Sequence, residues 1–269
     1  MKWFRFTPDE APDCTVSAWL QPGIDMEITE NTRYPAVIIC PGGGYRYLCA
    51  QEAEPVAKPF LAAGYHTFIL YYSVGEEAKG FRPLCQLAET ILQIRKKSAE
   101  WLVDPRKIAV CGFSAGGHLA ASAGTLFNEE KFLKVYGEKA DIRPNAMILG
   151  YPVITADEFA HVSSIEHVSG ARAGSAEYQW FGLDKRVDGL TPPAFIWHTA
   201  ADTNVPAENS LRFASALSRF KVPFELHIMP EGEHGMSVCT CETGRKSDYN
   251  GRWVEWSIQW LNHQFHYQL

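Results

Sequence analysis

The stretch KIAVCGFSAGGHLAA, residues 107–121, decides the fold of this chain. An apolar run leads into Gly-x-Ser-x-Gly, and a run of small residues typical of a helix follows. The pattern predicts a strand, a sharp turn and a helix, with Ser114 at the turn. We expect a turn too tight for a side chain on either flank of the serine, hence Gly112 and Gly116. The alternative is a glycine- and serine-rich turn without a chemical role, and the flanking strand and helix argue against it.

Around this stretch, apolar runs alternate with helical patterns. Strands are predicted at residues 34–40, 65–72, 146–151, 194–198 and 223–229, and helices at 51–63, 83–102, 206–220 and 249–265. This alternation implies right-handed crossovers and an α/β fold, with a mostly parallel central sheet and helices on both faces. Residues 1–33 contain short β-like runs, which we expect to form edge strands.

Length and composition narrow the class of protein. The 269 residues suffice for one large α/β domain, and no repeat or domain boundary is evident. A net charge of −6 gives no reason to expect a nucleic acid or an anionic membrane as partner. We find no secretory signal and no run of membrane-spanning length. The seven scattered cysteines favour a reducing compartment, so we expect a cytoplasmic protein.

Candidate catalytic residues follow the strands. A serine hydroxyl is a poor nucleophile and needs a base, which in turn needs a group that holds its tautomer. In a parallel sheet these groups lie on loops at the carboxyl ends of the strands. Asp202 follows the strand at 194–198, and His234 follows the strand at 223–229. The order Ser114, Asp202, His234 is the chain order of α/β-hydrolases.

Each member of this set has an alternative explanation. Asp202 could cap the helix that starts near Val205, and His234 could be a loop histidine without a role. Other acids are weaker candidates because they lie in a long insertion or beside His234 itself: Asp157, Asp184, Asp188, Glu231 and Glu233. We favour Asp202 because a triad acid is expected from the preceding loop.

An oxyanion hole needs N–H donors that are in place before the reaction. The first is expected at Ala115, directly after the nucleophile, and others on the loop after an early strand. Gly43 and Gly44 follow the strand at 34–40 and are the favoured donors; a glycine-rich turn with only a packing role is the alternative. The run lacks the pattern of a nucleotide-binding loop. Cys239 and Cys241 have no second pair at zinc spacing, and we expect neither a metal nor a cofactor.

Residues 153–190 interrupt the alternation of strands and helices and show no clear period. Long structureless connections are commonly lids or binding loops, so we expect this insertion to line the pocket. Trp180 and Phe181 are candidate wall residues near Ser114, and Tyr45 is a candidate on the glycine loop. The alternative is that the two insertion aromatics only anchor the loop to the core.

With these residues in place, the whole chain resembles the α/β-hydrolase esterases. The loop Pro41-Gly42-Gly43-Gly44-Tyr45 resembles the oxyanion loop of the hormone-sensitive-lipase-like group, although Pro41 stands where His is usual. The acid loop from His198 to Pro206 is also similar, with Thr199 in place of the usual Gly. The strand VPFELH, residues 222–227, resembles a bacterial subgroup labelled xylanase-B-like or acetyl-xylan-esterase-like.

The resemblance implies a serine carboxylesterase that acts on small-molecule esters with short acyl groups, with O-acetyl groups of carbohydrates as candidate substrates. Two alternatives remain. One is a serine peptidase of the prolyl-oligopeptidase type, although such enzymes usually carry a large extra domain. The other is a non-catalytic binding protein with the same fold, although such proteins commonly lose the triad. The oligomeric state is open.

Overall fold

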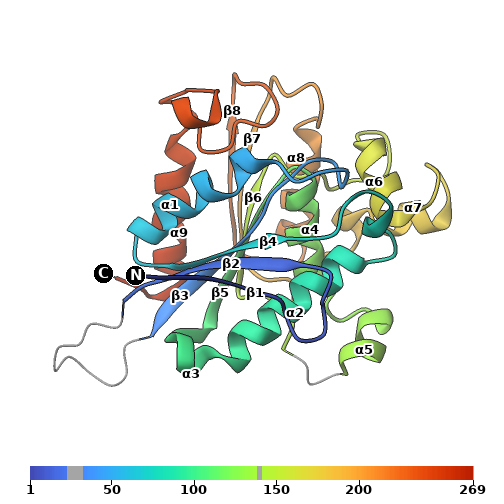
Figure 1. Ribbon diagram of the computed structural model, residues 1–269. Coiled ribbons are helices and arrows are strands. Elements are labelled where there is room, and N and C mark those ends of the chain that lie inside the picture. Colours follow the sequence, from blue (N-terminus) through green and yellow to red (C-terminus); the bar gives the residue numbers. More distant parts are fainter. Residues whose placement is uncertain (23–32, 138–140, 269) are drawn as a thin grey trace.

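A single eight-stranded sheet runs through the computed structural model, which describes residues 1–22, 33–137 and 141–268 (Figure 1). The strands are β1 (Lys2–Phe6), β2 (Thr15–Leu20), β3 (Tyr34–Cys40), β4 (His66–Tyr71), β5 (Val103–Phe113), β6 (Ala146–Gly150), β7 (Ala194–Thr199) and β8 (Phe224–Met229). Their spatial order is β1-β2-β4-β3-β5-β6-β7-β8.

Six of these strands, from β4 across to β8, pair in parallel, whereas β1 and β2 pair antiparallel at one edge. The predicted mostly parallel sheet and the predicted edge strands are therefore confirmed. The part of the N-terminal prediction that falls on residues 23–32 lies outside the described residues. Because the carboxyl ends of parallel strands share one edge of the sheet, the loops after β3, β5, β6, β7 and β8 all emerge there.

Helices cover both faces of the sheet. The α-helices are α1 (Glu54–Ala62), α2 (Arg82–Lys96), α3 (Ser98–Trp101), α4 (Ala115–Thr125), α5 (Glu130–Tyr136), α6 (Val162–Ser169), α7 (Ala176–Trp180), α8 (Glu208–Arg219) and α9 (Arg252–Phe265). Helices α1 and α9 pack with one hydrophobic cluster, and α2, α4 and α8 pack with the other. Figure 1 shows these two groups on opposite sides of the strands.

The central strands are buried on both faces. Every residue of β3 is buried, as is β5 from Ile108 onward. A strand that is covered by helices on both faces is expected to be continuously apolar, which is why residues 34–40 carry no polar break. The same covering holds the carboxyl end of β5, where Ser114 begins the turn, rigidly in the middle of the sheet.

The insertion at residues 153–190 contains regular structure that the sequence did not indicate. It holds α6, α7 and the short 3₁₀ helix η3 (Leu183–Lys185). The longest of these helices has eight residues, which is too short to establish a helical period against its neighbours. None of the described helices is both long enough and apolar enough to cross a lipid bilayer.

Candidate active site

Ser114 occupies the turn between β5 and α4 in a strained backbone conformation. Its φ is 53° and its ψ is −120°, which is an unfavourable region for a residue with a side chain. A Cβ atom on Gly112 would overlap the carbonyl of Gly116, and one on Gly116 would overlap the carbonyl of Cys40. The structure therefore confirms that both flanks of the serine require glycine, because backbone passes too close for a side chain.

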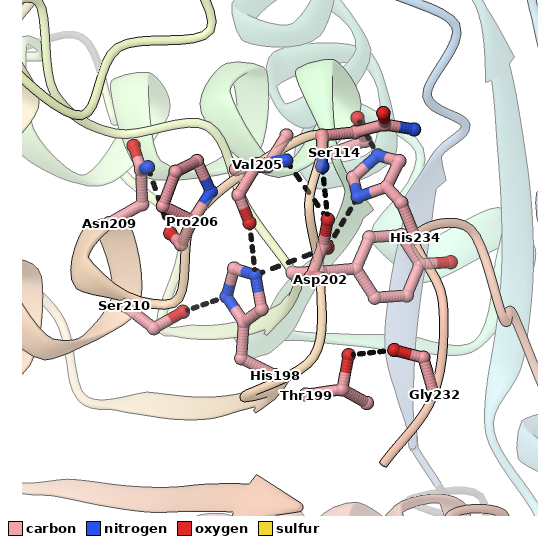
Figure 2. A network of polar contacts seen from close by, with 12 residues as sticks. Ser114, His198, Thr199, Asp202, Val205, Pro206, Asn209, Ser210, Gly232 and His234 are labelled. Atoms are coloured by element: carbon pink, nitrogen blue, oxygen red, sulfur yellow. Dashed lines mark hydrogen bonds and ion pairs between the residues drawn. The ribbon is translucent and has the colours of Figure 1, made fainter. Parts of the chain in front are cut away.

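The fold brings Ser114, His234 and Asp202 into hydrogen-bond contact (Figure 2). Nε2 of His234 lies 2.8 Å from Oγ of Ser114. Nδ1 of His234 lies 2.6 Å from Oδ2 of Asp202. An ionised carboxylate only accepts hydrogen bonds, so Nδ1 carries the proton and Nε2 is free to accept from the serine hydroxyl. The three side chains come from the loops after β5, β7 and β8.

Asp202 is buried and fully hydrogen-bonded. Its Oδ1 accepts from the backbone N–H groups of Asn204 and Val205, each at 2.9 Å. Burial by itself raises the pKa of the Asp202 carboxyl group, but hydrogen bonds from His198, His234 and the Val205 N–H together lower that pKa well below its ordinary value. Asp202 therefore carries a negative charge at neutral pH and stabilises a proton on His234.

Thr199, which replaces the glycine usual in similar sequences, has a structural role here. Its Oγ1 donates a hydrogen bond to the carbonyl of Gly232 at 2.8 Å. Gly232 lies two residues before His234, so this bond ties the end of β7 to the loop that carries the histidine (Figure 2).

The glycine loop after β3 lies beside Ser114. Gly43 and Gly44 line the same cavity as the serine, and no described residue accepts a hydrogen bond from either backbone N–H. Ala115 is the first residue of α4, so its N–H has no partner within the helix. The amide that precedes Gly43 on the glycine loop is engaged differently, because the N–H of Gly42 donates to Oε2 of Glu52 at 2.7 Å.

A cavity of about 300 Å³ opens in front of Ser114. Its walls are largely polar. They are formed by Gly43, Gly44, Arg46, Tyr47, Cys49, Gln51, Glu52, Ser114, His161, Asn204, His234, Gly235 and Arg245.

Tyr45 does not line this cavity, contrary to the expectation from the sequence. It is 1% exposed, and its hydroxyl lies 2.9 Å from Nδ1 of His118 in the core. Nε2 of His118 donates to the carbonyl of Phe181 at 3.0 Å, so Nδ1 accepts from the tyrosine. The backbone of Tyr45 has a φ of 59°, in the left-handed region, and its ring packs edge-on against His118 with centroids 5.8 Å apart.

Trp180 and Phe181 also lie away from the cavity that contains Ser114. Both pack against Phe81, with ring centroids 4.6 Å and 5.0 Å from its ring. The sequence left open whether these aromatics form the pocket wall or anchor the loop to the core. Their contacts are those of an anchor. The insertion reaches the cavity instead through His161, which directly precedes α6.

Three of the five competing acids have other partners. Asp157 accepts from Arg212 at 2.7 Å, Asp188 accepts from Asn128 at 2.8 Å, and Glu233 is paired with Arg245. None of the competing acids lies in hydrogen-bond contact with His234.

Two residues near the site were not found from the sequence. Tyr151 directly follows β6, and its ring packs edge-on against the His234 ring with centroids 5.0 Å apart. Glu52 accepts a hydrogen bond from the Tyr151 hydroxyl at 2.6 Å. Tyr151 lies at the carboxyl end of a predicted strand, and this position could have indicated a residue near the site. The sequence around Glu52 contains no comparable signal.

The parallel sheet, the strained serine turn and the contact of serine with histidine and aspartate define an α/β-hydrolase. Residues 24–217 match the sequence profile of the BD-FAE family, and the chain belongs to that family.

The relatives with similar sequences include xylan-degrading enzymes. The chain is 36% identical over 218 residues to endo-1,4-beta-xylanase B of Butyrivibrio fibrisolvens, covering 79% of this chain and 34% of the relative. It is 29% identical over 229 residues to an acetylxylan esterase of Xylanibacter ruminicola, covering 79% of this chain and 43% of the relative. The chain thus spans less than half the length of either relative.

Solved structures match over nearly the whole chain. The carboxylesterase Cest-2923 from Lactobacillus plantarum WCFS1 has a TM-score of 0.88 at 28% identity, with both chains fully covered. An acetyl ester-xyloside bifunctional hydrolase from Caldicellulosiruptor lactoaceticus has a TM-score of 0.81 at 33% identity, covering 93% of this chain and 88% of that one.

Proposed function

We propose that this chain is a serine carboxylesterase that hydrolyses short acyl esters through an acyl-enzyme intermediate. The observation that carries the proposal is the unbroken contact from Ser114 Oγ to His234 Nε2 at 2.8 Å and from His234 Nδ1 to Asp202 Oδ2 at 2.6 Å. This geometry supports proton transfer from the serine to the histidine during attack on an ester carbonyl.

The proposed reaction has two halves. Ser114 Oγ attacks the carbonyl carbon while His234 Nε2 takes its proton, and the N–H groups of Gly43, Gly44 and Ala115 stabilise the oxyanion. Collapse of the tetrahedral intermediate breaks the ester bond, and His234 protonates the leaving alcohol. A water molecule then attacks the acyl group with His234 again as base, which releases the acid and restores Ser114.

We propose O-acetyl esters of carbohydrates as the substrate class. The cavity is small, and Arg46, Gln51 and Asn204 offer hydrogen-bonding groups around it, which suits a short acyl group on a hydroxyl-rich alcohol. The names of the acetylxylan esterase and of the acetyl ester-xyloside hydrolase support the same class.

We also propose that the protein works in a reducing compartment such as the cytoplasm. The support is that all seven cysteines are free thiols, so no disulfide stabilises the fold.

The test compares p-nitrophenyl acetate, a longer acyl ester, an acetylated xylo-oligosaccharide and a prolyl amide as substrates of the wild type and Ser114→Ala. We expect acetyl esters to be hydrolysed, and Ser114→Ala to lose on the order of 10⁶ in kcat with its fold intact. More than a tenth of wild-type activity in Ser114→Ala would exclude a serine mechanism. Preferential cleavage of the prolyl amide would indicate a peptidase, and turnover of no substrate would indicate a binding protein.

A further inference from the structure

Glu52 is a buried carboxyl group beside the site, and it is not part of the contact between the serine, histidine and aspartate. It is 2% exposed and ends the 3₁₀ helix η1 (Ala50–Glu52), which follows the glycine loop. Its Oε2 accepts from the Gly42 N–H at 2.7 Å, and its Oε1 accepts from the Tyr151 hydroxyl at 2.6 Å. Burial carries a desolvation penalty that an apolar side chain would avoid, so this carboxyl group needs an explanation beyond packing.

Tyr151 connects Glu52 to the loop that carries the histidine. Its hydroxyl donates to Glu52 and accepts from the Ser237 N–H at 2.8 Å, and its ring packs against His234. The backbone of Tyr151 has a φ of 36°, an unfavourable value for a bulky residue. Such conformations persist only where the surroundings enforce them, and they cluster at functional sites.

A second route joins the same two loops. Oγ of Ser237 donates to the carbonyl of Gln51 at 2.5 Å, and the Cys49 N–H donates to the carbonyl of Gly42 at 2.9 Å. The glycine loop, η1 and the segment after His234 are therefore one hydrogen-bonded unit, and Glu52 and Tyr151 contribute a side-chain hydrogen bond to it.

We propose that Glu52 and Tyr151 are positioning residues that hold the oxyanion loop and the His234 loop in one fixed relative placement. The inference rests on the proposed function. By engaging the Gly42 N–H, Glu52 fixes the Pro41–Gly42 peptide group, which lies directly before the two peptide groups that carry the Gly43 and Gly44 N–H donors. By supporting the His234 ring, Tyr151 sets where the base meets Ser114. Donors and base must meet the same tetrahedral intermediate, and a misplacement of about 1 Å can reduce the rate about 10²-fold.

The test uses Glu52→Gln, Tyr151→Phe, the double variant and Tyr65→Phe as a matched control. Tyr65 is fully buried, and its hydroxyl donates to Oδ1 of Asn262 at the same 2.6 Å, but Tyr65 does not line the catalytic cavity. We would measure kcat and KM for p-nitrophenyl acetate below the unfolding range of every variant, together with Tm. Glu52→Gln and Tyr151→Phe should each lower kcat about 100-fold, with KM within about threefold of the wild type.

The double variant should lie within about threefold of the worse single variant, because both changes break one chain of hydrogen bonds. Tyr65→Phe should lower Tm without changing kcat. The inference would be overturned if folded Tyr151→Phe kept the wild-type kcat, or if the kcat losses of the two single variants multiplied in the double variant. If Glu52→Gln does not fold, the kcat of Tyr151→Phe decides alone. Failure of the proposed function is distinguishable, since an organophosphonate would then leave wild-type Ser114 unlabelled.

Discussion

His198 Nε2 lies 3.3 Å from Oδ2 of Asp202, the same oxygen that accepts the 2.6 Å hydrogen bond from His234. His198 is fully buried; its Nε2 donates to the carbonyl of Val205 at 2.9 Å, and its Nδ1 accepts from Ser210 at 2.7 Å. Asp202 is therefore held between two imidazole rings, one from the core and one from the cavity. This arrangement orients the carboxylate before any substrate binds.

Asp202→Asn should be far more damaging than Glu231→Gln or Glu233→Gln. An asparagine amide would donate to His234 Nδ1 and place the imidazole proton on Nε2. Nε2 could then no longer accept a hydrogen bond from Ser114. We expect a loss on the order of 10⁴ in kcat for Asp202→Asn and less than threefold for the two glutamine variants. Steady-state assays with p-nitrophenyl acetate would measure this, and a severe loss in Glu231→Gln or Glu233→Gln would assign the acid to that position.

His198→Phe should lower kcat about tenfold while leaving KM unchanged. The phenyl ring fills the same space but removes the donor beside Asp202, whereas the N–H groups of Asn204 and Val205 still hold the other oxygen. One lost hydrogen bond to a charged group corresponds to about 1.5–3 kcal/mol, and the lower end of this range, about tenfold, applies because the His198 N–H is shared with the Val205 carbonyl. If kcat is unchanged while Tm falls, His198 contributes to the core and not to the orientation of Asp202.

Trp180→Ala should lower stability and leave acyl preference unchanged. Its ring packs perpendicular to Phe81 and lies under the guanidinium of Arg186, 4.8 Å away. Loss of these contacts should lower Tm by roughly 2–6 °C. His161→Ala provides the contrast, because that residue lines the cavity and should change the ratio of kcat/KM for acetyl and hexanoyl esters. A changed ratio of kcat/KM for acetyl and hexanoyl esters in Trp180→Ala, with an unchanged Tm, would indicate that Trp180 forms part of the pocket wall.

His118 should make the protein sensitive to acid. Burial lowers the pKa of this imidazole to about 4, so it stays neutral in the folded state at pH values where the unfolded chain is already protonated. The free energy of unfolding therefore decreases by up to about 3 kcal/mol through this group as the pH falls from about 6.5 to 4.

Urea unfolding of the wild type and His118→Gln between pH 7 and 4 would measure this effect. The slope should be smaller in His118→Gln but not zero, because burial also lowers the pKa of His66 to about 4. The exposed residue His263 provides the control, and His263→Gln should keep the wild-type slope. Equal slopes in the wild type and His118→Gln would contradict the prediction.

Local sequence determined the framework of this protein. Continuous apolar runs predict buried parallel strands, and the predicted strand at residues 34–40 coincides with β3. Glycines on both sides of Ser114 mark the strained turn, because backbone crowding there permits no other residue. Asp202 and His234 could be selected because the residues that follow parallel strands necessarily share one edge of the sheet.

Tertiary structure alone decided where the remaining side chains point. Tyr45, Trp180 and Phe181 are aromatic residues in segments that the sequence predicts to line the cavity. They lie away from it because Tyr45 packs against His118 and the other two pack against Phe81. Glu52 and Tyr151 lie 99 residues apart in the chain, and each is unremarkable in its own segment. Their contact depends on the lateral order of the strands and on the path of two loops. Local periodicity carries no information about such long-range placement.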